Sequence, residues 1–243
     1  MQVYVARGAS TKKLPGILLI QEAFGVNEHI KAVADRIAQE GYVVYAPEIY
    51  HHTAGDNFNC AYSEFQSHAL THYERVTRET LDIDLKGAFE ALCADPLVDP
   101  TKIACIGFCL GGKVAFYANS ILPLKAAISF YGGGIDAEML DRAEFQSGPL
   151  FLAWGGKDAH ISVSSRKKVS GALTRAKKPF IEIAFSDADH GFFCDERTSY
   201  HPDSAAMAWG LLKAFFNRYL KPDSQTSEPE AKIKNQVGSQ GPL

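Results

Sequence analysis

The chain has 243 residues, 46% of them hydrophobic, with a formal net charge of −3 and a pI near 6.2. This composition supplies a sizeable apolar core and excludes global disorder, and the charge offers no basic surface for nucleic acid or an anionic membrane. No apolar run reaches the roughly 20 residues of a membrane span, and the first residues lack a signal-peptide pattern. We therefore expect a cytoplasmic protein without nucleic-acid or membrane partners. Because no strand edge or apolar stripe suggests an interface, we expect a monomer.

The cysteine pattern excludes the common structural uses of this residue. The five cysteines are odd in number, widely spaced and without a C-x-x-C pair, so neither a disulfide framework nor a zinc site is predicted. His68 and His72 are four residues apart, but no acidic residue has the spacing to complete a metal site. Reduced thiols suit a reducing compartment, and a cysteine nucleophile would require one.

Short apolar runs alternate with helical patterns along the chain. The expected strands cover residues 2–6, 16–21, 42–46, 102–106, 126–131, 150–154 and 180–185. Helical spacing of apolar residues covers residues 30–40, 63–93, 113–120, 162–176 and 203–220. This alternation predicts an α/β domain over residues 1–220, with a mostly parallel sheet and helices on both faces. Residues 221–243 are polar and are expected to form a flexible tail.

The most informative stretch is residues 102–118, KIACIGFCLGGKVAFYA. A β-branched apolar strand leads into a glycine-bracketed turn centred on Cys109, and a helical pattern follows. A G-x-nucleophile-x-G motif indicates a catalytic nucleophile when it lies between a strand and a helix, as it does here. The glycines allow the strained turn that exposes the nucleophile. The turn also places the side chain at a helix N-terminus, which favours a thiolate. A buried structural cysteine is the alternative interpretation.

Four chemically useful residues follow expected strands: Glu22, Cys109, Asp158 and His190. The carboxyl ends of parallel strands meet at one edge of a sheet, where active sites of open α/β folds lie. The last three occur in the order nucleophile, acid, histidine, which is the chain order of α/β-hydrolase triads.

The chemistry assigns a role to each member of this triad. His190 would take or share the Cys109 proton and later activate water, while Asp158 would orient the imidazole. The backbone N–H groups of Leu110 and Ala23 are the expected oxyanion donors, since Leu110 follows the nucleophile and Ala23 lies in the turn after the 16–21 strand.

These motifs resemble the dienelactone hydrolase (carboxymethylenebutenolidase) family of α/β-hydrolases. The matching segments are residues 21–27 (QEAFGVN), 107–112 (GFCLGG), 156–158 (GKD) and 190–192 (HGF). The resemblance implies an α/β-hydrolase fold and Cys–His–Asp hydrolysis of small lactones or esters, without a metal or organic cofactor. It also implies that Glu22 accepts the thiol proton when substrate arrives, which protects the resting thiol. An ordinary strand-end carboxylate is the alternative for Glu22.

The sequence departs from the family pattern where a substrate carboxylate would bind. The founding members carry an arginine four residues after the catalytic histidine, and that position is Cys194 here. Arg197 is one candidate replacement. A second family arginine has no clean match, although Arg75 and Arg78 lie in the corresponding region. Tyr131 resembles a family position near the substrate, with a buried aromatic as the alternative.

Other functions remain open at this stage. A general carboxylesterase or thioesterase would use the same residues on other substrates. A non-catalytic binding or receptor domain would be expected to have a broken triad, whereas all three residues are present. A redox sensor would need an unusually peroxide-reactive Cys109.

Overall fold

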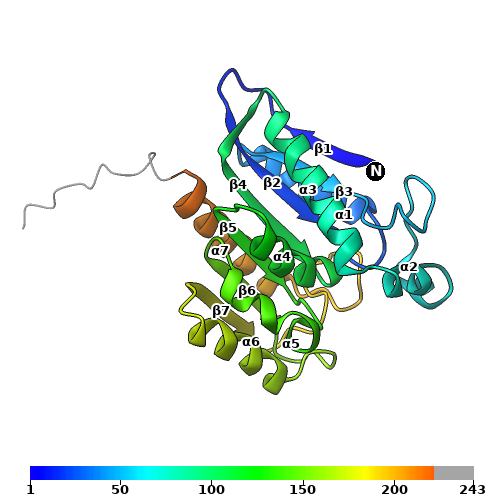
Figure 1. Cartoon of the computed structure of the whole chain (residues 1–243). Helices are drawn as coiled ribbons and strands as arrows, with labels where there is room; N and C mark the ends of the chain where they lie inside the picture. The colour runs from blue at the N-terminus through cyan, green and yellow to red at the C-terminus, as the bar shows by residue number, and fades with distance from the viewer. Residues whose placement is uncertain (222–243) are drawn as a thin grey trace, which may run out of the picture.

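The computed structural model describes residues 1–221, and the predicted tail at residues 221–243 lies outside the described residues except for its first. Seven strands form one sheet in the order β1-β3-β2-β4-β5-β6-β7 (Figure 1). β1 pairs antiparallel with β3, and the other pairs are parallel. The strands are β1 Val3–Arg7, β2 Leu14–Ile20, β3 Val43–Pro47, β4 Val98–Phe108, β5 Ala126–Phe130, β6 Leu150–Gly155 and β7 Phe180–Phe185. Each predicted strand is therefore present, with small shifts at its ends.

Helices cover both faces of this sheet, as the alternating pattern predicts. In Figure 1, α3 and α4 lie in front of the sheet and α7 lies behind it. α1 shares the side of α7, because the Arg36 guanidinium lies 4.3 Å from the centre of the Trp209 ring. None of the helices in the described part of the chain is both long and apolar enough to cross a bilayer. The long helices are α1 Glu28–Gln39, α3 Arg78–Ala94, α4 Leu110–Ile121, α6 Val163–Arg175 and α7 Pro202–Leu220.

The core lies where the apolar strands meet these helices. Residues 17–20 of β2 and 126–128 of β5 are completely buried, which explains their uninterrupted apolar sequence: helices cover both faces. Two predicted helix starts are confirmed by their caps. The Asn27 side chain accepts a hydrogen bond from the Ile30 N–H, and Ser162 accepts one from the Ser165 N–H.

The predicted helix over residues 63–93 is wrong as a single element. The chain forms a 3₁₀ turn (Tyr62–Glu64), a π-helical turn (Phe65–Ala69) and the short helix α2 (Leu70–Glu74) before α3 begins. Thr77 breaks the helical path because its backbone is extended and its side chain caps α3. We refer to residues 62–74 as the cap segment. Two short helices were not predicted, α5 (Ile135–Glu138) and a 3₁₀ helix (Leu140–Phe145).

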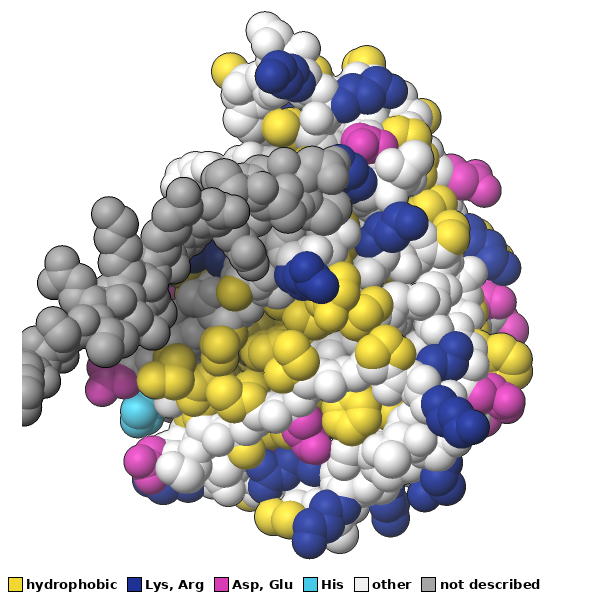
Figure 2. Space-filling model, turned by 90° about the vertical axis from the view of Figure 1, so that its left-hand side faces the viewer, with side chains coloured by type: hydrophobic (Ala, Val, Ile, Leu, Met, Phe, Trp, Pro, Cys, Tyr) yellow, Lys and Arg dark blue, Asp and Glu magenta, His cyan; other side chains and the backbone are white. Residues whose placement is uncertain are grey.

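The β7 edge of the sheet carries more apolar surface than the sequence indicated. Ile181 is 49% exposed, and a groove of about 330 Å³ runs between β7 and α7, lined in part by Ile183, Leu211 and Tyr219. Figure 2 shows hydrophobic side chains gathered on this side of the molecule. The sequence reasoning behind an expected monomer, which assumed no apolar edge, is therefore incorrect on this point.

Candidate active site

Cys109 occupies the sharp turn between β4 and α4. Its backbone has φ 55° and ψ −115°, a left-handed conformation that is costly for a residue with a side chain. The turn closes tightly, since a Cβ on Gly107 would lie 1.9 Å from the Gly111 carbonyl oxygen. The glycines are therefore required by close backbone approach, and the strained turn predicted from the motif is confirmed.

His190 lies between Cys109 and Asp158. Its Nε2 atom is 3.1 Å from Cys109 Sγ, and its Nδ1 atom is 2.8 Å from Asp158 Oδ2. The other Asp158 oxygen accepts hydrogen bonds from the backbone N–H groups of His160 and Ile161, at 2.8 and 3.1 Å. The Asp158 carboxylate is thus fixed on both sides. The structure brings together the three residues that the sequence predicts to act as a unit.

The electrostatics of this group favour an ionised carboxylate beside a protonated imidazole. Burial alone would lower the pKa of His190, but its hydrogen bonds to Asp158 and Cys109 and their charges raise it to about 10. Burial raises the pKa of Asp158, yet its hydrogen bond to His190, the imidazolium charge and two backbone N–H groups together lower it below its ordinary value.

Glu22 follows β2 and is completely buried. Neither of its carboxylate oxygens has a hydrogen-bond partner, and its nearest cation is Arg197, whose Nη1 atom is 3.6 Å from Glu22 Oε1. Burial lowers the pKa of Arg197, but the Glu22 charge and the other polar groups around it raise it above the ordinary value. Gly191 makes room for this arginine, because a Cβ there would lie 2.6 Å from the guanidinium.

A cavity of about 450 Å³ opens above Cys109 and His190. Arg197 also lines the cavity, and its guanidinium lies 5.6 Å from the centres of the Phe24 and Tyr62 rings. The wall is otherwise mainly apolar and aromatic, and much of it comes from the cap segment: Tyr62, Phe65, Leu70 and Tyr73.

The expected oxyanion donors lie at this cavity. Leu110 is the first residue of α4, and both Leu110 and Ala23 line the cavity together with Cys109. N–H groups in the first turn of a helix have no partner within the helix. Behind the Ala23 turn, the Tyr50 hydroxyl donates a hydrogen bond to the Ala23 carbonyl oxygen at 3.2 Å, which helps fix the turn.

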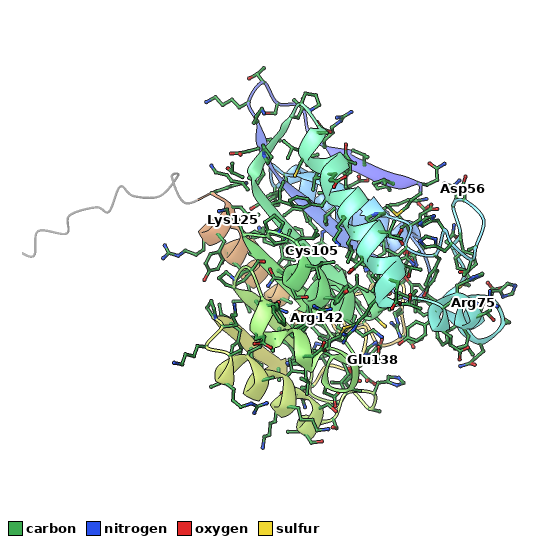
Figure 3. All side chains as sticks on the ribbon, viewed as in Figure 1. Asp56, Arg75, Cys105, Lys125, Glu138 and Arg142 are labelled. Carbon is green, nitrogen blue, oxygen red and sulfur yellow. The ribbon has the colours of Figure 1, made fainter. Side chains whose placement is uncertain are left out.

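Three of the four predicted substrate contacts lie elsewhere. Arg78 is held by Asp141 at 2.7 Å, so its charge is already matched. Arg75 is exposed at the end of α2, and Figure 3 shows it at the periphery of the molecule. Tyr131 is fully buried with a positive φ of 37°, and its ring packs 5.1 Å from that of His190. None of these three lines the cavity, so Arg197 is the one predicted substrate-binding residue that does.

The sequence analysis missed the aromatic wall and one histidine. The cap segment contains aromatic residues. Their position at the cavity could not be predicted, because residues 63–93 were expected to form one helix. His160 lines the cavity, and its ring lies 5.2 Å from that of His190. Cys105 is completely buried within the sheet (Figure 3).

Two side-chain groups in the described residues have the composition of a metal site, and neither includes Cys109. One joins His29, Cys194 and Asp195, and the other joins His51, His52 and Asp84. Cys194 is buried with its Sγ donating to the Tyr62 hydroxyl at 3.1 Å, so it supports the cavity wall in place of the family arginine.

Comparison with known proteins identifies the family. The family model "Dienelactone hydrolase family" matches residues 1–220. A Synechocystis protein provisionally named carboxymethylenebutenolidase is 34% identical over 229 residues, which cover 90% of this chain and 92% of that protein.

Solved structures give the same result. A Klebsiella pneumoniae protein provisionally identified as a dienelactone hydrolase has a TM-score of 0.80 and 29% identity, covering 89% of this chain and 92% of its own. The metagenomic dienelactone hydrolase-like promiscuous phosphotriesterase P91 has a TM-score of 0.75 and 26% identity, covering 86% and 88%. The fold is that of the α/β-hydrolases, and the chain belongs to the dienelactone hydrolase family, a group of hydrolases that act on ester bonds.

Proposed function

We propose that this protein is a cysteine-dependent hydrolase of small lactones or esters that works through a thioacyl-enzyme. One observation carries the proposal: His190 lies within hydrogen-bond distance of both Cys109 Sγ (3.1 Å) and Asp158 Oδ2 (2.8 Å) at the floor of a cavity. A nucleophile, a base and a group that orients the base are the minimum set for acyl transfer.

The first half of the reaction opens the ester. The Cys109 thiol loses its proton to Glu22, and the thiolate attacks the carbonyl carbon. The backbone N–H groups of Leu110 and Ala23 stabilise the oxyanion that forms; one such donor contributes roughly 3 kcal/mol to other acyl-transfer enzymes. When the C–O bond breaks, the imidazolium of His190 gives its proton to the departing oxygen. Asp158, which stays ionised and hydrogen-bonds to His190 Nδ1, raises the pKa of His190 and so favours this protonated imidazole.

The second half releases the acid. Water attacks the thioester carbonyl and gives its proton to His190, which restores the imidazolium. The C–S bond breaks, and the Cys109 thiolate recovers its proton from Glu22. Asp158 stays ionised throughout and holds the imidazole in one orientation. The net reaction consumes one water and leaves every protein group in its starting state.

Arg197 gives the site its substrate preference. Its guanidinium faces the cavity and meets Glu22 at 3.6 Å without a hydrogen bond. A carboxylate on the substrate would form a closer, charge-assisted contact with Arg197. Glu22 would then lose its partner and become a stronger base beside the thiol. Substrate binding and thiol activation are in this way coupled, and the preferred substrates are lactones or esters that carry a carboxylate.

The decisive experiment traps the intermediate. Wild type, Cys109→Ala and Cys194→Ala are mixed with p-nitrophenyl acetate and quenched with acid during turnover. We expect intact-protein mass spectrometry to show one added acetyl group on wild type and Cys194→Ala, and none on Cys109→Ala. Acetylation that persists in Cys109→Ala, or that maps to another residue, would exclude the mechanism.

A second candidate function is a general carboxylesterase or thioesterase. The apolar, aromatic cavity wall favours it, since uncharged acyl groups would bury well there. A substrate panel separates the two: a carboxylate-bearing dienelactone, its methyl ester, a neutral thioester and, because of the relative P91, a neutral phosphotriester. Preference for the free carboxylate supports the first function, and equal or faster turnover of neutral substrates supports the second.

A further inference from the structure

A second cluster of reactive side chains lies outside the active-site cavity. His51 and His52 follow β3, and Asp84 lies on α3. The Nε2 atoms of the two histidines approach the same carboxylate oxygen, Asp84 Oδ1, at 2.8 and 3.0 Å. The two rings also lie against each other at a tilt of 39°, with centroids 3.9 Å apart. The Nε2 atoms of two neighbouring histidines therefore converge on one carboxylate oxygen of α3.

The carboxylate at this point is buried, while the histidines are reachable. The Asp84 side chain is 3% exposed, and its second oxygen, Oδ2, has no hydrogen-bond partner. The side chains of His51 and His52 are 21% and 34% exposed. A buried carboxylate oxygen without a partner is costly, so the cluster lacks one favourable interaction. An ion arriving from solvent would meet the imidazoles first.

We propose that His51, His52 and Asp84 form a binding site for a divalent transition-metal ion, with Zn²⁺ the best match. Two imidazole nitrogens with one carboxylate oxygen suit zinc, whereas Mg²⁺ and Ca²⁺ take oxygen ligands. The three ligand atoms already lie within 4.8 Å of one another. Metal–ligand bonds of about 2.0–2.2 Å in a tetrahedron place ligand atoms roughly 3.3 Å apart. The two nitrogen–oxygen contacts, now 2.8 and 3.0 Å, would therefore lengthen by only about 0.3 to 0.5 Å.

The ion would fix a turn that supports the active site. Tyr50 precedes the two histidines, and its hydroxyl donates to the Ala23 carbonyl oxygen. Thr53 follows them and lies 2.9 Å from His72 Nδ1 of the cap segment. A metal that ties residues 51 and 52 to α3 would restrain the Ala23 turn and the cap segment together. This consequence depends on the proposed function, but the metal site itself does not.

The test measures zinc binding to the full-length protein in a Cys109→Ala background, which removes the catalytic thiol as a competing ligand. Metal-free protein at neutral pH is titrated with Zn²⁺ against a chromophoric zinc indicator. We expect one equivalent to bind. Asp84→Asn and His52→Ala should each weaken binding by at least about 100-fold, because even outer-shell partners are worth 10–100-fold. His68→Ala, which removes an exposed histidine of the cap segment, is the matched control and should bind normally.

Cobalt identifies the ligands independently. Co²⁺ bound to this site should give visible bands of a low-symmetry four-coordinate ion without a thiolate charge-transfer band. A thiolate band would assign binding to the group of His29, Cys194 and Asp195 instead and would overturn the proposal. So would a protein that binds no zinc, or one whose binding survives in both Asp84→Asn and His52→Ala. Circular dichroism shows whether each variant is folded, and zinc should raise the Tm of the Cys109→Ala protein but not of its Asp84→Asn derivative.

Discussion

Asp158 and Glu22 both follow strands of the parallel sheet, and their side chains are equally buried but differently bound. The side chains of Asp158 and Glu22 are each 1% exposed. Asp158 accepts hydrogen bonds from His190 and from two backbone N–H groups. Glu22 accepts none and faces Arg197 at 3.6 Å. One carboxylate is fixed in place, and the other is held only by charge. The two carboxylates differ in the number of their hydrogen-bond partners and not in burial. Asp158, with three hydrogen bonds, is suited to orient His190, whereas Glu22, with none, is free to change its partner.

The largest effect is expected at Cys109, the proposed nucleophile. Cys109→Ala removes the nucleophile and should lower kcat/KM for p-nitrophenyl acetate by about 10⁴-fold or more. Steady-state hydrolysis measures this loss. Cys93→Ala is the matched control, because it removes a half-buried thiol of α3 that does not line the cavity, and it should keep most of the activity. Comparable losses in both variants would show that the effect is structural.

The fixed carboxylate comes next. Asp158→Asn keeps the size of the side chain but favours the wrong imidazole tautomer, and should lower kcat by about 10³-fold with little change in KM. Stopped-flow measurement of acylation and deacylation should show both steps slowed. If kcat changed by less than tenfold, Asp158 would not be the group that orients His190.

Loss of the Glu22 carboxylate should lower activity less than loss of Asp158, and it should also change the pH dependence. Glu22→Gln removes a base while keeping its shape, and should lower kcat/KM by about 100-fold. The remaining activity should rise with pH, because thiol ionisation then depends on solvent base. A pH–rate profile of the variant and wild type measures this. Loss of activity without any change in the profile would assign Glu22 a structural role only.

Removing the positive charge of Arg197, the partner of Glu22, should change the preference between charged and neutral substrates. Arg197→Gln should lower the ratio of kcat/KM for a carboxylate-bearing lactone over its methyl ester by about 30-fold, the effect of losing a charge-assisted hydrogen bond of about 2 kcal/mol. Arg78→Gln is the matched control, since Arg78 pairs with Asp141 away from the cavity. An unchanged ratio in Arg197→Gln would remove Arg197 from substrate recognition.

A separate prediction, measured on unfolding and not on turnover, concerns stability and pH. The pKa of His190 is about 10 in the folded protein, above its ordinary value of 6.5, so protonation favours folding. This contribution is complete below pH 6.5 and is lost as the pH rises towards 10. The free energy of unfolding in urea should therefore fall over this range, and it should fall less steeply in His190→Gln. Parallel curves for the two proteins would contradict the raised pKa.

Much of the fold, and the arrangement of Cys109, His190 and Asp158, could be predicted because the physics involved is local. Buried parallel strands leave continuous apolar runs such as residues 17–20, and the left-handed turn at Cys109 needs nearby glycines. His190 and Asp158 could be placed because strand ends of a parallel sheet share one edge.

The rest depends on contacts that no short pattern records. Arg75 is exposed and Arg78 pairs with Asp141, and neither placement is marked in the sequence. Arg197 reaches the site through the turn after Gly191, whose path is set by packing. The contact between His51 and Asp84 joins residues 33 positions apart, and nothing in the sequence marks it.

The position of the cap segment bears on how the substrate range of this enzyme could evolve. It supplies much of the substrate-facing wall, yet none of its residues belongs to the sheet that positions Cys109, Asp158 and His190. Irregular connections tolerate substitution better than the elements they join. Selection could therefore reshape the substrate wall at Phe65 or Tyr73 while the catalytic machinery stayed intact, so new substrates are accessible to this scaffold by few mutations.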